Sequence, residues 1–202
     1  MFEAQNLDCI LGQRVIFEDL SFKIKSGDVL ILKGRNGSGK SSLLRILAGL
    51  LRPSSGSLLW QGRSVLSELD DHFERCQYVG HLDAIKSALS ILENISFWVQ
   101  VRGYSSDKLT SALQKFEIED VSDFPARFLS AGQKRRVSLA RLIASPAAIW
   151  LLDEPAASLD QVMVGHLESM IKNHRNNGGI IVLSTHQDLN LKDTVDLKLD
   201  CL

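Results

Sequence analysis

The sequence contains little cysteine, almost no net charge and no long hydrophobic run. Its three cysteines, Cys9, Cys76 and Cys201, are too few and too widely spaced for a disulfide framework or a metal cluster, which predicts free thiols in a reducing compartment. A formal net charge of −1 gives no overall basic field that would attract nucleic acid or acidic lipid. The longest apolar runs, such as 147–152, fall far short of the roughly 20 residues that span a bilayer.

The amino-terminal residues also lack the features of a targeting segment. "MFEAQNLDCI" contains Glu3 and Asp8 and has no basic segment ahead of a long apolar stretch, so no signal peptide is expected. The shares of hydrophobic (45%) and charged (23%) residues are those of an ordinary globular domain. We therefore expect a chain that is soluble by itself, and a role at a membrane would require a partner.

Short apolar runs alternate with amphipathic stretches, which predicts an α/β fold with a largely parallel sheet. The runs "DVLILKG" (28–34), "IWLLDE" (149–154) and "IIVLST" (180–185) are typical of buried parallel strands, and "LSFKIKSG" (20–27) of a half-buried one. Helical patterns cover residues 40–51, 133–144 and 160–174.

Residues 87–128 follow a different pattern that predicts a small helical lobe inserted into this core. Ser90 and Glu93 have the spacing of a capping box, and a second amphipathic pattern follows in "DKLTSALQKF" (107–116). We expect one domain over 1–202, with the core in 1–80 and 134–202 and the helical part in about 81–133.

A glycine-rich stretch predicts a phosphate-binding loop. It fits G-x-x-x-x-G-K-[ST] and stands between a predicted strand and a predicted helix. This context argues against a glycine-rich turn that matches the motif by chance. Its glycines let backbone N–H groups turn toward phosphate oxygens at a helix N-terminus, while the lysine reaches the β- and γ-phosphates and the serine hydroxyl ligates Mg²⁺. The candidate residues are Gly34, Arg35, Asn36, Gly37, Ser38, Gly39, Lys40 and Ser41, followed by Ser42.

Two carboxylates follow the strand "IWLL". In such sheets, nucleotides bind at the carboxyl ends of the strands, so Asp153 is a candidate for holding Mg²⁺ and Glu154 for polarising the attacking water as a general base. The alternative, two solvated loop acids, is disfavoured by the phosphate loop upstream.

The order of five motifs resembles that of ATP-binding-cassette (ABC) ATPases. Besides the phosphate loop and the "IWLLDE" strand, the chain has "LSAGQ" (129–133), which resembles the signature motif of that family, and "SLD" (158–160) and "STH" (184–186). The resemblance implies ATP and Mg²⁺ as cofactors, a P-loop core with a mixed, mostly parallel sheet and an antiparallel N-terminal β part. It also implies a head-to-tail homodimer. In that dimer Ser130, Gly132 and Gln133 would contact the ATP of the second copy, Asp160 would lie at the seam, and His186 would contact the γ-phosphate.

Three positions depart from the family pattern. Leu11 stands where the family has an aromatic ring against adenine, with Phe17 the nearest aromatic residue, so we expect weaker and less base-selective nucleotide binding. His81 replaces a glutamine that senses Mg²⁺, and imidazole can still ligate metal-bound water. Ala131 in place of the first signature glycine is a milder change.

Over its full length the chain resembles the ATPase subunits of the bacterial cytochrome c maturation system. The segments that carry this likeness are "YVGH", "LENISFW", "LSAGQKRRVSLARL" and "GGIIVLSTHQ". The resemblance implies a peripheral location on the cytoplasmic face of the inner membrane and an integral membrane permease as partner. ATP hydrolysis there would drive haem export or release of a haem-loaded chaperone. The five histidines show neither metal spacing nor an axial haem motif, so we expect no direct haem binding: His72, His81, His166, His174 and His186.

Other interpretations remain open from the sequence. The chain could be the ATPase of another ABC transporter, for lipoprotein, an ion or a peptide, or a soluble mechanical ATPase; a P-loop switch protein or kinase fits the signature and His186 less well. Lys134, Arg135 and Arg136 are expected to form a solvated helix face, and no nucleic-acid partner is expected. Phe97 and Trp98 are either core or interface residues.

Overall fold

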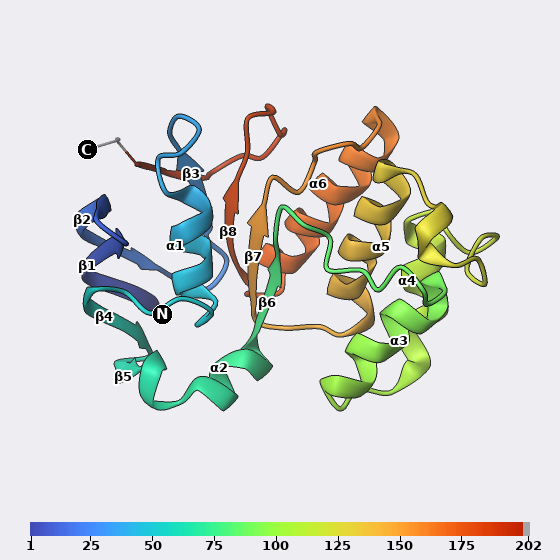
Figure 1. Ribbon diagram of the computed structural model, residues 1–202, viewed down its shortest axis with the longest axis horizontal. Coiled ribbons are helices and arrows are strands. Elements are labelled where there is room, and N and C mark those ends of the chain that lie inside the picture. The colour runs from blue at the N-terminus through green and yellow to red at the C-terminus, as the bar shows by residue number, and fades with distance from the viewer. Residues whose placement is uncertain (200–202) are drawn as a thin grey trace.

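Two β-sheets and six α-helices organise residues 1–199, the part of the chain that this computed structural model describes (Figure 1). Cys201, expected above to be a free thiol, lies outside the described residues, while Cys9 and Cys76 are buried and unpaired. The α/β expectation is confirmed, because one sheet is parallel throughout and the antiparallel sheet is built mainly from the amino-terminal strands.

The parallel sheet has the strand order β6-β7-β8-β3-β9, and all four pairings within it are parallel. Its strands are β3 (Val29–Lys33), β6 (Cys76–Val79), β7 (Ile149–Asp153), β8 (Ile180–Ser184) and β9 (Val195–Lys198). The second sheet has the order β2-β1-β4-β5 and pairs antiparallel. Its strands are β1 (Phe2–Leu11), β2 (Arg14–Ile24), β4 (Ser55–Trp60) and β5 (Arg63–Ser64).

The helices cover the two faces of the parallel sheet. In Figure 1, α1 lies between the two sheets, and α5 and α6 cover the opposite face, with α3 and α4 beyond them. The bounds are α1 (Lys40–Leu47), α2 (Leu69–Arg75), α3 (Ile91–Val101), α4 (Leu109–Lys115), α5 (Ala131–Ala144) and α6 (Gln161–Asn176). Short 3-10 turns cover Val65–Ser67, Ser106–Lys108 and Ala126–Phe128.

Alternate residues of the central strands point to opposite faces and build two hydrophobic clusters. One cluster joins α1 and the antiparallel sheet to Leu30, Leu32, Ile149, Leu151, Ile180 and Val182. The other cluster contains residues of the helices α3, α4, α5 and α6 together with the strand residues Val29, Ile31, Trp150, Leu152, Ile181 and Leu183. Because strands buried on both faces need apolar side chains at every position, the apolar residues of these strands form continuous runs rather than alternating with polar ones.

The helical segment shares its hydrophobic cluster with the core. Ile91, Ile95 and Phe116 are fully buried in the same cluster as Trp150 and Leu152. The predicted capping box is confirmed, since the Ser90 hydroxyl accepts a hydrogen bond from the Glu93 N–H at 3.1 Å and the Ser90 N–H donates to the Glu93 carboxylate at 2.7 Å.

Several predicted boundaries shift for local reasons. Helix α1 ends at Leu47 rather than 51, because the chain turns at Gly49 with a φ of +74°. Helix α5 begins at Ala131 rather than 133, because Ser130 is its N-cap. Helix α6 runs from 161 to 176, with Asp160 as N-cap. The strand expected from residue 20 begins at Arg14.

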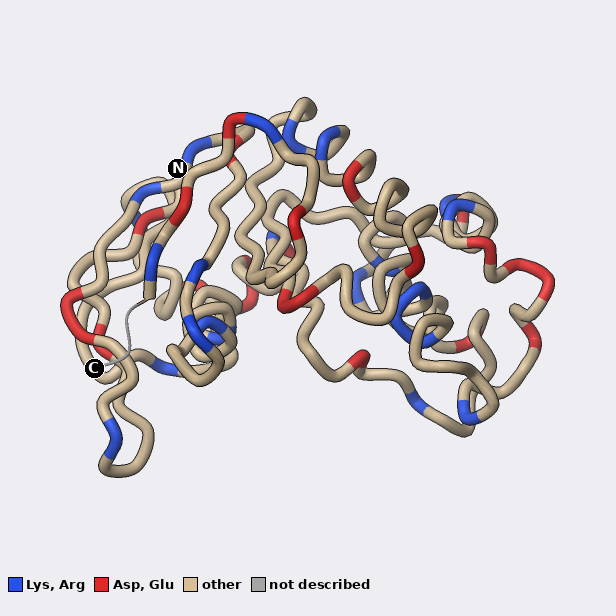
Figure 2. Tube along the Cα trace, turned by 90° about the horizontal axis from the view of Figure 1, so that it is seen from above, with Lys and Arg blue, Asp and Glu red and all other residues tan. Residues whose placement is uncertain are grey.

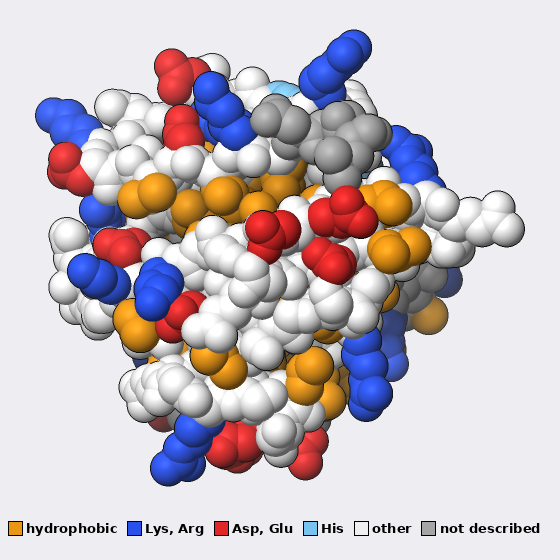
Figure 3. All heavy atoms as spheres, turned by 90° about the vertical axis from the view of Figure 1, so that its left-hand side faces the viewer, with side chains coloured by type: hydrophobic (Ala, Val, Ile, Leu, Met, Phe, Trp, Pro, Cys, Tyr) orange, Lys and Arg blue, Asp and Glu red, His pale blue; other side chains and the backbone are white. Residues whose placement is uncertain are grey.

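The expectation of a solvated basic face at residues 134–136 is wrong for Arg135, which is 3% exposed. Arg136 is paired with Asp160 at 2.6 Å. Along the chain trace, the positions of Lys and Arg are interspersed with those of Asp and Glu (Figure 2). On the face that carries the antiparallel sheet, apolar side chains form small patches among charged ones (Figure 3). No helix within residues 1–199 has the length and apolar character needed to cross a membrane.

Candidate nucleotide-binding site

The loop between β3 and α1 ends in a backbone conformation that requires glycine. Gly39, the N-cap of α1, has a φ of +96°, and a Cβ there would lie 2.4 Å from the Ile16 side chain. Within residues 1–199, no side chain makes a capping hydrogen bond at this helix N-terminus. Its first-turn N–H groups are therefore left for another acceptor, and a helix N-terminus favours an anion.

Lys40 follows at the first position of α1 and is almost fully buried. Its ammonium group donates to the carbonyl oxygens of Gly34 at 2.8 Å and Arg35 at 3.0 Å, so it closes the loop on itself. The Ser38 hydroxyl is buried and has no hydrogen-bond partner within residues 1–199.

Asp153 ends β7 and is also buried. One carboxylate oxygen, Oδ1, accepts a hydrogen bond from the Ser184 hydroxyl at 2.7 Å. The other, Oδ2, is buried and has no hydrogen-bond partner in the described part of the chain. A buried carboxylate oxygen without a donor is costly unless a cation or a water satisfies it.

Glu154 comes next, in a left-handed backbone conformation with a φ of +49°. Its N–H donates to the Ser184 carbonyl and hydroxyl oxygens at 3.2 Å and 3.0 Å. One oxygen of its carboxylate, Oε2, accepts a hydrogen bond from the backbone N–H of His186 at 3.1 Å. The imidazole Nε2 of His186 lies 3.5 Å from the other oxygen, Oε1. The ends of β7 and β8 therefore hold this carboxylate and this histidine together.

These groups surround a single cavity of about 510 Å³ at the carboxyl edge of the parallel sheet. Ten of the predicted residues line it: Asn36, Gly37, Gly39, Lys40, Ser41, Ser42, His81, Asp153, Glu154 and His186. Gly34, Arg35 and Ser38 belong to the loop but do not line the cavity. Ile16 and Ala157 line it as well and were not predicted.

Among the described residues, none of those lining this cavity carries a Phe, Tyr or Trp ring. Leu11, where the family pattern has its aromatic ring, is 42% exposed at the end of β1, and Phe17 is buried in the core. Ile16, between them, is the residue of this hairpin that reaches the cavity.

The signature residues line a different hollow, of about 560 Å³, and no residue in the described part of the chain lines both hollows. Its lining consists of Ser130, Gly132, Gln133, Arg136, Ser158 and Asp160. Ser130 and Gln133 form a capping box at the start of α5: Ser130 Oγ accepts from the Gln133 N–H at 3.2 Å, and the Ser130 N–H donates to Gln133 Oε1 at 2.9 Å.

Two contacts join this hollow to the segment before α6. A Cβ at position 132 would lie 2.8 Å from the Ser158 carbonyl oxygen, which explains the glycine there. Asp160 caps α6 through the Met163 N–H at 2.9 Å and pairs with Arg136. The hydrogen bond from Met163 is the main cause that lowers the pKa of Asp160, with the Arg136 charge adding to it.

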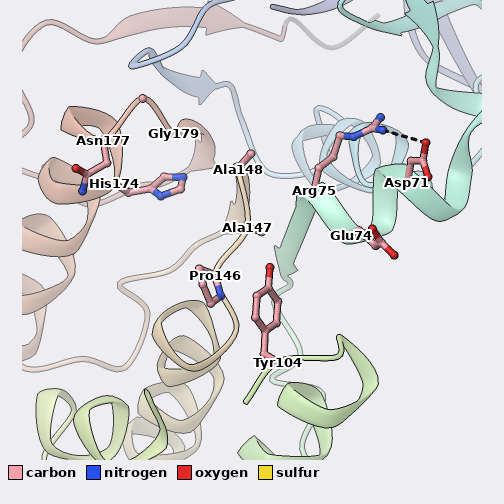
Figure 4. A pocket seen from close by; sticks show the side chains of 11 residues that line it. Asp71, Glu74, Arg75, Tyr104, Pro146, Ala147, Ala148, His174, Asn177 and Gly179 are labelled. Carbon is pink, nitrogen blue, oxygen red and sulfur yellow. Dashed lines mark ion pairs between the residues drawn. The ribbon is translucent and has the colours of Figure 1, made fainter. Parts of the chain in front are cut away.

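A larger hollow, of about 630 Å³, lies at the opposite edge of the sheet (Figure 4). It includes Ala148 and Gly179, which directly precede β7 and β8. His174, whose ring stacks on Trp150 with centroids 3.9 Å apart, also lines it. Because α/β sheets bind nucleotides at the carboxyl ends of their strands, this hollow is not the nucleotide site.

Four polar residues in or beside the two hollows were not among the predicted site residues: Arg135, Arg136, Ser158 and Ser184. Ser184 stands in the recognised "STH" motif, and its hydroxyl joins Asp153 to Glu154. Arg135 stands in a run of three basic residues, and no feature of that run distinguishes its buried member from its neighbours.

The phosphate loop, the paired carboxylates and the signature helix on this fold define an ATP-hydrolysing cassette of the ABC type. A family model described as ABC transporter matches residues 17–157, and the chain belongs to that family.

Among curated proteins, the chain is similar to several that carry one name, "Cytochrome c biogenesis ATP-binding export protein CcmA". The protein of Rhodospirillum rubrum is 50% identical over 200 residues, which cover 99% of this chain and 86% of the relative. That of Paramagnetospirillum magneticum is 45% identical, with 98% and 94% covered. That of Dechloromonas aromatica is 42% identical, with 95% of each chain covered.

Solved structures agree on the fold. An ATP-binding subunit of an ABC transporter superposes with a TM-score of 0.89 at 21% identity, covering 99% of this chain and 87% of the other. The dimeric bacterial ABC transporter cassette MJ0796 gives a TM-score of 0.86 at 24% identity, with 99% and 94% covered.

Proposed function

We propose that this chain is the ATP-hydrolysing subunit of an ABC complex for cytochrome c maturation, where hydrolysis drives haem export or release of a haem-loaded chaperone. The observation that carries the proposal is the 50% identity, over 99% of the chain, to a protein named for cytochrome c biogenesis and ATP-binding export. The lining of the 510 Å³ cavity supplies the chemistry that such a subunit needs.

The phosphates of ATP bind at the N-terminus of α1. Here the uncapped N–H groups, Lys40 and the hydroxyls of Ser41 and Ser42 meet the β- and γ-phosphates. Lys40 then exchanges its bonds to the Gly34 and Arg35 carbonyls for bonds to phosphate. This exchange is favourable because charge-assisted hydrogen bonds are stronger than bonds to neutral carbonyls. Gly34, Arg35, Asn36, Gly37, Ser38 and Gly39 form the loop around them.

The residues present fit a Mg²⁺ ion bound with the nucleotide. Ser41 and Asp153 would hold it and His81 would reach its water shell, since all three line the cavity. The orphaned Oδ2 of Asp153 is the observation that supports this assignment, because hard cations prefer carboxylate oxygens. An ion held there would supply positive charge against the negative charge of the phosphates.

Glu154 acts as general base on the attacking water. The carboxylate takes a proton from water as the water oxygen bonds to the γ-phosphorus, and the bond from that phosphorus to the oxygen of the leaving ADP breaks. The backbone N–H of His186 holds one oxygen of the Glu154 carboxylate. The imidazole of His186 lies 3.5 Å from the other carboxylate oxygen and is available to the γ-phosphate. Lys40 stabilises the charge that develops on the phosphoryl oxygens.

The signature residues act on the nucleotide of a second copy, bound head to tail. Support comes from the separation of the two hollows, which share no lining residue. The Ser130 oxygen accepts from the Gln133 N–H, so its own O–H remains free to donate to a phosphate. Gly132 and Gln133 present the N-terminus of α5 beside it, and Asp160 lies at the seam between the copies.

An apolar groove of about 600 Å³ is the proposed docking site of the membrane permease. It is lined mainly by apolar surface from Leu50, Phe73, Leu82, Trp98 and Val101. Leu82, at 81% exposure, directly follows His81 of the nucleotide cavity. A helical segment of the permease seated here would contact the loop that reaches the nucleotide, and the chain would sit on the cytoplasmic face of the inner membrane.

Co-purification from native membranes tests this proposal. A tagged chain would be extracted with its host's membranes in mild detergent, and its partners identified by mass spectrometry. The expected result is recovery of small membrane-spanning proteins of cytochrome c maturation, with binding weakened by Leu82→Glu and unaffected by Val195→Glu on the exposed edge strand β9, at the opposite edge of the parallel sheet. Recovery of a different permease would overturn the cytochrome assignment and favour the second candidate, the ATPase of another ABC transporter.

A further inference from the structure

Arg135 is buried within a helix whose first turn carries the signature residues. It lies at the fifth position of α5, and its side chain is 4% exposed. A buried arginine is costly unless its charge and all of its N–H groups are satisfied.

The guanidinium makes five hydrogen bonds, as many as it has N–H groups. Nη2 donates to the carbonyl oxygens of Asp153 at 2.6 Å and Glu154 at 2.7 Å, and Nε donates to that of Pro155 at 3.2 Å. Nη1 donates to the Gly80 carbonyl at 2.8 Å and to the Asp83 carboxylate at 3.1 Å.

Three consecutive carbonyls converge on this one group. In an extended strand, successive carbonyls point to opposite sides, so residues 153–155 must leave the strand conformation. They do so at Glu154, whose φ of +49° is unfavourable for a residue with a side chain. Ser184 of β8 holds the Glu154 N–H from one side, and Arg135 holds its carbonyl from the other.

From this geometry we infer that Arg135 is a positioning residue for ATP hydrolysis. It fixes the backbone of Glu154 in the conformation that aims the carboxylate at the γ-phosphate site, and it ties that backbone to residues 80–83 beside the groove. The inference rests on the proposed role of Glu154. A lysine in this place would have three N–H donors on a single nitrogen, and a glutamine would have two. Neither side chain can reproduce the five hydrogen bonds that the planar guanidinium makes.

Arg175 provides a matched control. It also uses its guanidinium to hold backbone carbonyls, donating to Gly27 at 3.2 Å and Asp193 at 3.2 Å, as well as to Lys192. It lies near the carboxyl end of α6 and contacts none of residues 153–155 through these bonds. Arg175→Gln therefore removes a comparable structural clamp away from the nucleotide cavity.

The experiment measures kcat and KM for ATP in the purified full-length chain with its membrane partner. Arg135→Gln and Arg135→Lys should each lower kcat by about 100-fold, the lower end of what a positioned general base contributes, with KM changed less than about threefold. Arg175→Gln should keep kcat within about threefold of the parent value. Melting temperature and fluorescent-ATP affinity of each variant report folding separately.

Glu154→Gln distinguishes failure of this inference from failure of the proposed function. If Arg135 acts through Glu154, the double variant Arg135→Gln/Glu154→Gln should be no slower than Glu154→Gln alone, because residues that act as a unit are not additive. Full ATPase activity in Glu154→Gln would overturn the proposed role of Glu154 as general base, on which this inference rests. An inactive Glu154→Gln together with an active Arg135→Lys or Arg135→Gln would overturn only the role of Arg135. Unfolding of both Arg135 variants would also overturn it, since the residue would then serve the core alone.

Discussion

Replacing Ser130 with alanine should lower both the thermal stability and the ATPase rate. The same replacement at Ser90, the matched control, should lower the thermal stability alone. Both serines are N-caps in capping boxes, with side-chain bonds of 3.2 Å at Ser130 and 3.1 Å at Ser90. Loss of such a cap costs about 1 kcal/mol, so both variants should melt roughly 2–4 °C lower.

Only Ser130 lines the hollow assigned to the nucleotide of the second copy. A hydrogen bond to a charged group contributes about 1.5–3 kcal/mol, so Ser130→Ala should lower the ATPase rate by roughly 10- to 150-fold, while Ser90→Ala leaves it unchanged. Phosphate release and thermal unfolding measured on the same samples give both quantities. An equal loss of activity in the two variants would refute the reasoning, because it would assign the effect to the helix cap rather than to a phosphate contact.

Three further predictions concern the nucleotide and pH. Lys40→Ala should weaken ATP binding by roughly 10- to 150-fold because charge-assisted bonds to phosphate are lost, and unchanged affinity would contradict the phosphate-loop assignment. Leu11→Tyr should tighten ATP binding, since stacking on a base contributes about 1–3 kcal/mol; unaltered affinity would show that residue 11 does not reach adenine. Burial lowers the pKa of His72, because it disfavours the charged imidazolium. Stability should therefore be complete above about pH 6.5 and decline as the pH falls below that value, because the unfolded chain takes up a proton there. Melting temperatures between pH 7.5 and 5.5 should show a smaller decline in His72→Gln, and an equal decline would contradict this cause.

Local spacing was sufficient to predict the parts of the site that follow strands. The phosphate loop and the Asp153–Glu154 pair both come directly after a buried apolar run, and parallel strands bring their carboxyl ends to one edge. The Ser90–Glu93 capping box could be read from its spacing in the same way. The equivalent spacing of Ser130 and Gln133 was present but was assigned to nucleotide contact alone, which put the start of α5 two residues late.

Features that depend on tertiary packing could not be predicted. Whether an arginine in a basic run is solvated or buried depends on what faces it, and Arg135 faces the ends of β6 and β7. Likewise, which residue of the first hairpin lines the cavity depends on how the antiparallel sheet packs on α1, and Ile16 does so rather than Leu11 or Phe17. The seven-residue helix α2 is too short for its periodicity to stand out.

The most direct test of the central claim, an ATP site shared between two copies, is to mix two inactive variants. Lys40→Ala loses the phosphate loop but keeps its signature, and Ser130→Arg loses the signature but keeps its phosphate loop. Each should be nearly inactive alone, because a symmetric homodimer then lacks a complete site. In a one-to-one mixture, half of the dimers would hold one intact site of two, so activity should return to roughly a quarter of the parent value. No recovery in a mixture shown to form mixed dimers would contradict the account, because the signature would then be acting on the nucleotide of its own chain.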